Sequence, residues 1–176
     1  MTDGRNGQRT LVLLRHAKAE QSPDAPDAER PLTARGHADA AAAGAWLARR
    51  ELLPDVVLCS PARRTRQTWH GVAMGMTGSP AEGGPAGSTP AVRYEPTAYQ
   101  AHPDELLELV RGVDPAAGTV LLIAHNPGIS LLSALLAPER ADPDGLRTTD
   151  IVVHRPTGAW SELSRAPLSA RHTARA

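Results

Sequence analysis

Residues 11–20 read LVLLRHAKAE, and this stretch decides the fold. The run TLVLL (10–14) is almost continuously apolar, a pattern typical of a strand that is covered on both faces, as in a parallel sheet. The strand ends at a charged pair, Arg15 and His16, which is followed by the small Ala17. Ligands of open α/β sheets sit beyond the carboxyl ends of the strands, so the residues after each strand are the first place to look for a site.

Outside this stretch, predicted strands and helices alternate along the chain. Thr33 is suited to cap the first helix, and Ser60-Pro61 starts the second. We predict strands at 56–58, 92–94, 119–124, 151–154 and 160–163, and helices at 33–50, from 60 to about 73, at 102–111 and at 128–136. This order predicts a three-layer α/β/α fold with a mainly parallel central sheet.

The length of 176 residues is sufficient for one domain with a sizeable core, which we place at about 9–164. Residues 75–90 are rich in Gly, Pro and Ser and are expected to form a flexible loop, because neither flank could fold alone. Residues 166–176 are expected to form a frayed C-terminal tail.

Composition excludes several classes of function. Lys plus Arg and Asp plus Glu both number 19, and this zero net charge argues against bulk binding of nucleic acid or a membrane surface. The single cysteine, Cys59, excludes an internal disulfide and a zinc-cysteine cluster. The first ten residues are polar and no apolar run approaches transmembrane length, so we expect a soluble cytoplasmic protein. The sequence does not indicate an oligomeric state.

Three predicted strand ends carry side chains suited to one chemistry. They bear Arg15-His16, the segment SPARR (60–64) and His125, and in a parallel sheet they converge on one crevice beside two helix N-termini. Guanidinium groups bind phosphate oxygens in pairs, and a neutral histidine can attack phosphorus. Taken alone, each segment is more typical of a solvated loop or an ordinary helix start than of a functional site. Their coincidence at three strand ends predicts a phosphate site with a nucleophile.

The segments LVLLRHAKAE, SPARRTRQTW and LLIAHNPG together resemble the histidine phosphatase superfamily, also called phosphoglycerate-mutase-like. The segment ERPLTARG is similar to the small bacterial phosphohistidine phosphatases of the signal-inhibitory type. The resemblance covers about residues 9–164. It implies the phosphoglycerate-mutase-like α/β fold and a reaction that needs neither a metal nor another cofactor.

The resemblance also implies roles for individual residues. His16 would be the nucleophile, Arg15 a phosphate clamp and His125 a contact of the phosphoryl oxygens. In the family pattern S-P-x-x-R-x-x-Q-T, which starts here at Ser60, the second clamp is Arg64 rather than its neighbour in the sequence. Arg30, within ERPLTARG, would reach the substrate, although an ordinary role in a surface loop explains it equally well.

Two positions depart from the family pattern. The usual glycine after the first histidine is Ala17, whose backbone carbonyl can still orient His16 unless the position needs a positive φ. Phosphoester-cleaving relatives carry an acidic proton donor after the second helix. In that segment, VRYEPTAYQAHPDE, Tyr99 stands where the acid is expected. The candidate acids nearby are Glu95, Asp104 and Glu105.

An alkoxide leaving group gains from general-acid help, whereas the P–N bond of phosphohistidine is already labile. We therefore expect a metal-independent phosphatase that removes phosphate from phosphohistidine on a protein through a phosphohistidine intermediate. The alternatives are a phosphatase of small phosphoesters or nucleotides and a non-catalytic phosphate-binding module. A mutase is less consistent with the chain length, because mutases carry longer insertions that cover the site.

Overall fold

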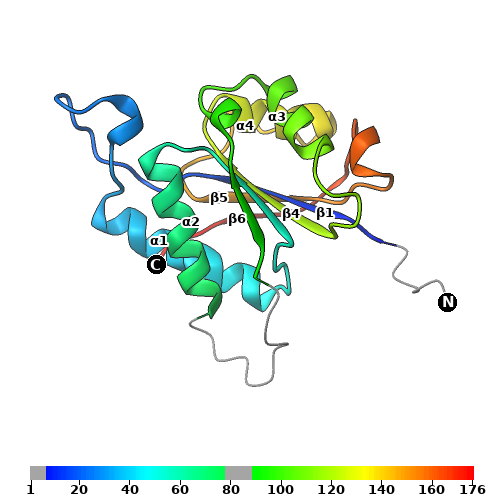
Figure 1. Ribbon diagram of the computed structural model, residues 1–176, viewed down its shortest axis with the longest axis horizontal. Helices are drawn as coiled ribbons and strands as arrows, with labels where there is room; N and C mark the ends of the chain where they lie inside the picture. The colour runs from blue at the N-terminus through cyan, green and yellow to red at the C-terminus, as the bar shows by residue number, and fades with distance from the viewer. Residues whose placement is uncertain (1–6, 78–88) are drawn as a thin grey trace.

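The computed structural model describes residues 7–77 and 89–176, and the six strands in these ranges form one sheet (Figure 1). The strand order is β3-β2-β4-β1-β5-β6. The strands are β1 (Thr10–Arg15), β2 (Val56–Cys59), β3 (Ala91–Tyr94), β4 (Thr119–Ala124), β5 (Asp150–His154) and β6 (Leu168–Thr173). Strands β3, β2, β4 and β1 run parallel to one another. Strand β5 is antiparallel to β1, and β6 is antiparallel to β5. The prediction of a mainly parallel sheet is confirmed.

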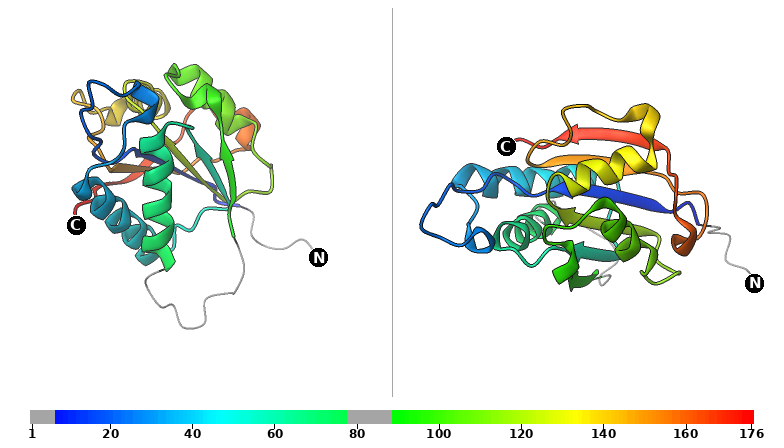
Figure 2. Two further views of the ribbon diagram at one scale, coloured as in Figure 1. Left: turned by 60° about the vertical axis from the view of Figure 1, so that its left-hand side comes forward. Right: turned by 90° about the horizontal axis from the view of Figure 1, so that it is seen from above.

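Two layers of helix cover the sheet. On one face lie α1 (Ala34–Arg49) and α2 (Arg63–Thr77), and on the other lie α3 (Pro103–Arg111) and α4 (Gly128–Leu136) (Figure 2). The side chains of β1 alternate between two apolar clusters: Leu11 and Leu13 pack on the α3–α4 side, and Val12 and Leu14 on the α1–α2 side. Both faces of this strand are therefore buried, which explains its continuous apolar run. The predicted three-layer α/β/α fold is confirmed.

The helix pair beside the site is closely packed. Thr33 caps α1 as predicted, because its hydroxyl oxygen accepts a hydrogen bond from the Gly36 N–H at 2.9 Å. In the middle of α1, a Cβ added to Gly44 would lie 2.0 Å from the carbonyl oxygen of Val72 in α2. A glycine at this position lets the backbones of α1 and α2 approach closely.

The C-terminal region differs from the prediction. Residues 160–163 were expected to pair with β5, but Trp160–Glu162 is a 3₁₀ turn whose buried indole N–H donates to the Ala117 carbonyl at 2.7 Å. The partner of β5 is β6, which lies within the segment expected to fray. A short strand of mixed polarity has little signal of its own, and here it is fixed by tertiary contacts: Thr173 donates its hydroxyl to the buried Asp150 at 2.6 Å.

The predicted flexible loop at 75–90 is only partly described. Helix α2 continues to Thr77, so the first residues of that segment are helical. Residues 78–88 lie outside the described residues, and the prediction of flexibility there stays a prediction.

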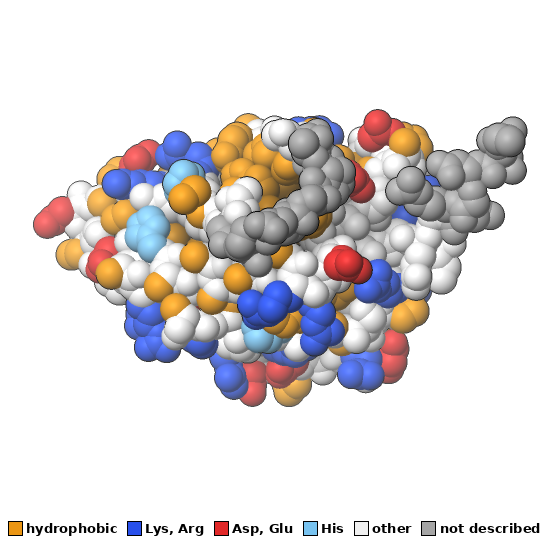
Figure 3. Space-filling model, turned by 90° about the horizontal axis from the view of Figure 1, so that it is seen from below, with side chains coloured by type: hydrophobic (Ala, Val, Ile, Leu, Met, Phe, Trp, Pro, Cys, Tyr) orange, Lys and Arg blue, Asp and Glu red, His pale blue; other side chains and the backbone are white. Residues whose placement is uncertain are grey.

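The surface agrees with the balanced composition. On the face shown in Figure 3, Lys and Arg side chains are interspersed with Asp and Glu side chains. Within residues 7–77 and 89–176, no helix is long and apolar enough to cross a membrane. In the same ranges, no group of three or more His, Cys, Asp or Glu side chains is placed to hold a metal ion.

Candidate active site

The carboxyl ends of three adjacent strands form the site. Strand β4 lies between β2 and β1, so the residues that follow these strands come together at one edge of the sheet. The His16 N–H donates to the Ala124 carbonyl at the end of β4 at 3.2 Å, and the Ser60 N–H donates to the Ile123 carbonyl at 3.1 Å. Helices α2 and α4 both begin a few residues beyond these ends. The convergence predicted from the sequence is therefore present.

His16 is held as a neutral imidazole with one free nitrogen. Its Nδ1 lies 2.8 Å from the carbonyl oxygen of Ala17, and since a carbonyl only accepts, Nδ1–H is the donor. Burial, together with the positive charges of Arg15, Arg64 and Arg30, lowers the His16 pKa from 6.5 to about 4. At neutral pH the Nε2 atom therefore keeps its lone pair, as a nucleophile must.

The replacement of the family's glycine by Ala17 preserves this arrangement. Ala17 is buried and does not adopt a positive φ, so its methyl group causes no backbone strain. Its carbonyl accepts from His16, and its N–H donates to the hydroxyl of Thr68 in α2 at 3.0 Å. The expectation that the orienting hydrogen bond survives is confirmed.

The two predicted arginines lie at the site with part of each guanidinium unpartnered. Arg15 donates from Nη1 to the Leu146 carbonyl at 3.0 Å, and Arg64 donates to Asp27. The Nε atoms of both arginines are buried and have no hydrogen-bond partner among the described residues. Arg64 is 5% exposed, whereas its neighbour Arg63 is exposed to solvent, which agrees with the choice of Arg64 made from the pattern.

His125 completes the cluster. Its ring centroid lies 5.2 Å from that of His16, and its Nε2 lies 2.7 Å from the Oγ of Ser60. Within residues 7–77 and 89–176, its buried Nδ1 has no hydrogen-bond partner, like the Nε atoms of Arg15 and Arg64. Burial, followed by repulsion from His16 when it is protonated and from Arg64, lowers the His125 pKa to about 3. Buried polar groups without partners cost free energy, so three of them in the cluster with His16 fit an anion with several acceptor oxygens.

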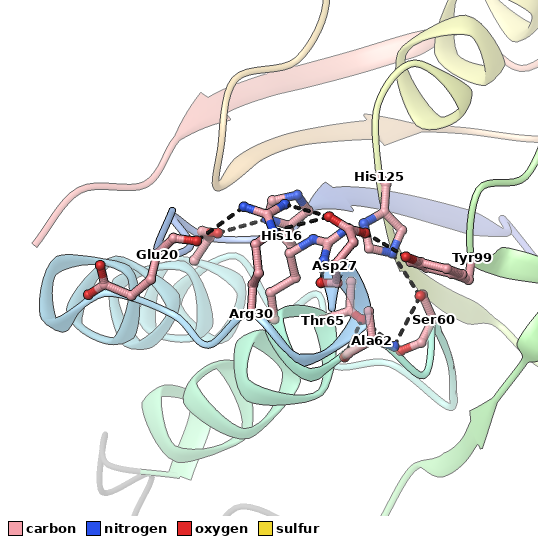
Figure 4. A network of polar contacts seen from close by, with 11 residues as sticks. His16, Glu20, Asp27, Arg30, Ser60, Ala62, Thr65, Tyr99 and His125 are labelled. Carbon is pink, nitrogen blue, oxygen red and sulfur yellow. Dashed lines mark hydrogen bonds and ion pairs between the residues drawn. The ribbon is translucent and has the colours of Figure 1, made fainter. Parts of the chain in front are cut away.

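Asp27 is the member of the site that the sequence reasoning missed. It begins a 3₁₀ turn before α1, and its carboxylate accepts from the Tyr99 hydroxyl at 2.5 Å and from Arg64 and Arg30 at 3.0 Å (Figure 4). The hydrogen bond from Tyr99, followed by the interactions with both arginines, lowers the Asp27 pKa to about 2. The sequence did offer a signal for Asp27: it lies three residues before Arg30, and arginines in a loop are often paired with a nearby carboxylate.

Arg30 joins the site through Asp27. Besides the ion pair with that carboxylate, its guanidinium donates to the Glu20 carbonyl at 3.2 Å. Tyr99 stands against the site as its position in the pattern indicated, with its ring packed edge-on to His125 at a centroid distance of 5.6 Å. These contacts give Arg30 a structural role in holding Asp27, next to the substrate contact that the resemblance implies.

The three candidate acids of the sequence are engaged elsewhere or exposed. Glu95 pairs with Arg93 at 2.6 Å, and Glu105 accepts the His102 N–H at 3.0 Å at the start of α3. Asp104 lies exposed in the first turn of the same helix. The carboxylate that does contact the cluster is that of Asp27.

Comparison with known proteins identifies relatives of this arrangement. The family model described as histidine phosphatase superfamily (branch 1) matches residues 11–82. An uncharacterized protein of Mycobacterium tuberculosis is 33% identical over 159 residues, which are 85% of this chain and 91% of that protein. An uncharacterized protein of Mycobacterium leprae is 30% identical over 175 residues, 92% of this chain and 100% of that protein.

A solved structure from Nakamurella multipartitia, assigned as the phosphohistidine phosphatase SixA, is 34% identical to this chain. Its TM-score is 0.78, and the match covers 97% of this chain and 98% of that one. A structure from Agrobacterium tumefaciens with the same assignment is 25% identical, with a TM-score of 0.75 and coverage of 94% and 98%. These matches span the whole arrangement of strands and helices around the cluster.

Proposed function

This chain belongs to the histidine phosphatase superfamily, and from the geometry of its site we propose that it removes the phosphoryl group from phosphohistidine on a protein, without a metal. The observation that carries the proposal is the neutral His16, oriented by the Ala17 carbonyl, beside buried and unpartnered nitrogens of Arg15, Arg64 and His125. A nucleophile surrounded by donors suits an electrophile that carries anionic oxygens.

The reaction has two steps. In the first, Nε2 of His16 forms a bond to phosphorus while the bond from phosphorus to the substrate nitrogen breaks. The electron pair of that bond leaves with the substrate imidazole, which is released neutral because its other ring nitrogen carries a proton. In the second, a water oxygen bonds to phosphorus, the P–Nε2 bond breaks, and inorganic phosphate and free His16 result. Throughout both steps, Arg15, Arg64 and His125 hold the phosphoryl oxygens and stabilise the charge that develops on them.

The choice of phosphohistidine over an alkyl ester rests on Asp27. This carboxylate contacts the cluster, but with a pKa of about 2 it holds no proton to give at neutral pH. Protonation of the leaving group by a positioned acid typically contributes 10²–10⁴-fold, and an alkoxide needs this help more than an imidazole does. The similarity to proteins assigned as phosphohistidine phosphatases supports the same substrate class. A cytoplasmic location and a protein partner stay predictions.

The test is release of inorganic phosphate from an N-phosphohistidine peptide in EDTA, beside an alkyl phosphomonoester, with His16→Ala as the blank. We expect fast release from the peptide, slow release from the ester and none from the blank, whose fold is checked by circular dichroism. Turnover by His16→Ala at the wild-type rate would overturn the assignment of the nucleophile.

Two other outcomes would indicate a different function. Release from the ester alone would indicate a phosphatase of small phosphoesters or nucleotides, which the same cluster of donors can also accommodate. Tight binding of orthovanadate without turnover on any phosphate would indicate a phosphate-binding module. The intact nucleophile disfavours that reading, because binding alone does not need a free Nε2 on His16.

A further inference from the structure

Ser60 lies at a point where it can decide which nitrogen of His125 carries the proton. The side chain of Ser60 is fully buried at the end of β2, and its Oγ lies 2.7 Å from Nε2 of His125. The backbone fixes it in place: the Ser60 N–H donates to Ile123 in β4, and its carbonyl accepts from the Thr65 hydroxyl at 2.7 Å. These contacts fix the Ser60 backbone, and the Ala62 N–H, which points to its Oγ at 3.4 Å, favours the rotamer that faces His125.

The hydrogen bonds around Ser60 set the direction of the Ser60–His125 contact. The Ala62 N–H points to the Ser60 Oγ at 3.4 Å, so that oxygen is used as an acceptor. The Ser60 hydroxyl is buried, and among the described residues Nε2 of His125 is the only acceptor within reach of its proton. A neutral imidazole that accepts at Nε2 carries its proton on Nδ1. That Nδ1 is buried and has no hydrogen-bond partner among the residues that the structure describes.

The same pair of residue types occurs a second time in the structure, where the tautomer follows from the contacts alone. His154 in β5 places Nδ1 at 2.9 Å from the Ala166 carbonyl, which can only accept, so Nδ1 carries the proton. Its Nε2 then accepts from the hydroxyl of Ser133 in α4 at 2.9 Å. In the pair at the site, the carbonyl that would take the Nδ1 proton is missing, and an anion would take its place.

We propose that Ser60 is a positioning residue that holds His125 in the tautomer protonated at Nδ1, so that this N–H donates to an oxygen of the bound phosphoryl group. The inference rests on the proposed function for the identity of the anion. Without the serine, the proton could move to Nε2, and the lone pair of Nδ1 would then face the negative oxygens. Only the fraction of molecules with the correct tautomer would bind productively.

The experiment measures the tautomer directly by long-range proton–nitrogen correlation of the histidine rings at neutral pH. His154 serves as the internal reference for an imidazole that donates from Nδ1 and accepts a serine hydroxyl at Nε2. We expect His125 to give the same pattern in the wild type, to change it in Ser60→Ala, and to regain it in Ser60→Thr, which restores a hydroxyl.

Binding of inorganic phosphate is measured on the same samples. We expect Ser60→Ala to weaken phosphate binding and lower kcat/KM by about tenfold, which corresponds to the net free energy of one ordinary hydrogen bond. The matched control is Ser133→Ala, which removes a serine hydroxyl from the other buried histidine, away from the site, and should leave phosphate binding and turnover unchanged. If Ser60→Ala acted only by destabilising the fold, Ser133→Ala would lower phosphate binding and turnover as well.

The inference is overturned if wild-type His125 carries its proton on Nε2, or if Ser60→Ala leaves the tautomer and phosphate binding unchanged. Failure of the proposed function gives a different result. In that case the wild type would turn over no phosphorylated substrate, while the tautomer, its response to Ser60→Ala and the binding of inorganic phosphate would still support the role of Ser60.

Discussion

Acid should destabilise the folded protein through His16, and the size of the effect follows from its burial. The folded pKa is about 4 against 6.5 for an exposed histidine. Above pH 6.5 the imidazole is neutral in both states. As the pH falls from 6.5 to about 4, the unfolded chain binds a proton at this histidine and the folded protein does not. The free energy of unfolding therefore decreases across this window.

The magnitude comes from the difference between these two pKa values. At about 1.4 kcal/mol per pKa unit, His16 alone accounts for a loss of about 3 kcal/mol once the pH is below both values. Between pH 7.5 and pH 5, the same two pKa values give a loss of about 2 kcal/mol, an appreciable part of the stability of a typical domain.

The assay is urea denaturation of the wild type and His16→Asn at a series of pH values and constant ionic strength. The variant has no group to protonate at this position, so it should lose about 2 kcal/mol less than the wild type between pH 7.5 and pH 5. His37→Asn, which removes an exposed histidine of α1, controls for the change of residue type. Equal pH dependence in the wild type and His16→Asn would refute the reasoning that burial keeps the nucleophile neutral.

Three further predictions concern the clamp, the helix pair and the carboxylate of the site. Arg64→Lys should lower kcat/KM by about 100-fold, because a lysine cannot reproduce the guanidinium fork, whereas Arg63→Lys on the exposed side of the same turn should stay within about twofold. Gly44→Ala should lower the free energy of unfolding in urea by about 1–3 kcal/mol, since the new Cβ meets the Val72 carbonyl; unchanged stability would contradict that contact. Asp27→Asn should tighten inhibition by orthovanadate, because it removes a negative charge beside Arg64; weaker inhibition would show that the carboxylate mainly positions the arginine.

Much of the fold could be predicted because its signals are local. The apolar runs that became β1 and β4, the Thr33 cap and the apolar faces of α3 and α4 depend on neighbours within a few residues, and all were located within a residue or two. Strand β6 was missed because its mixed sequence has no strong strand pattern. It pairs because β5 presents an open edge and because Asp150, buried beside it, accepts hydrogen bonds from that segment.

By itself, the sequence determined which residues meet at the candidate site. Arg15, His16, Arg64 and His125 stand at fixed offsets from strand ends, and a parallel sheet necessarily brings such ends together. Only the tertiary structure decided how these groups are tuned. The burial that keeps both histidines neutral, the Asp27 carboxylate on Arg64 and the Ser60 hydroxyl on His125 each depend on segments that are distant in the chain. Desolvation and hydrogen bonding arise from packing, so no local pattern in the sequence records them.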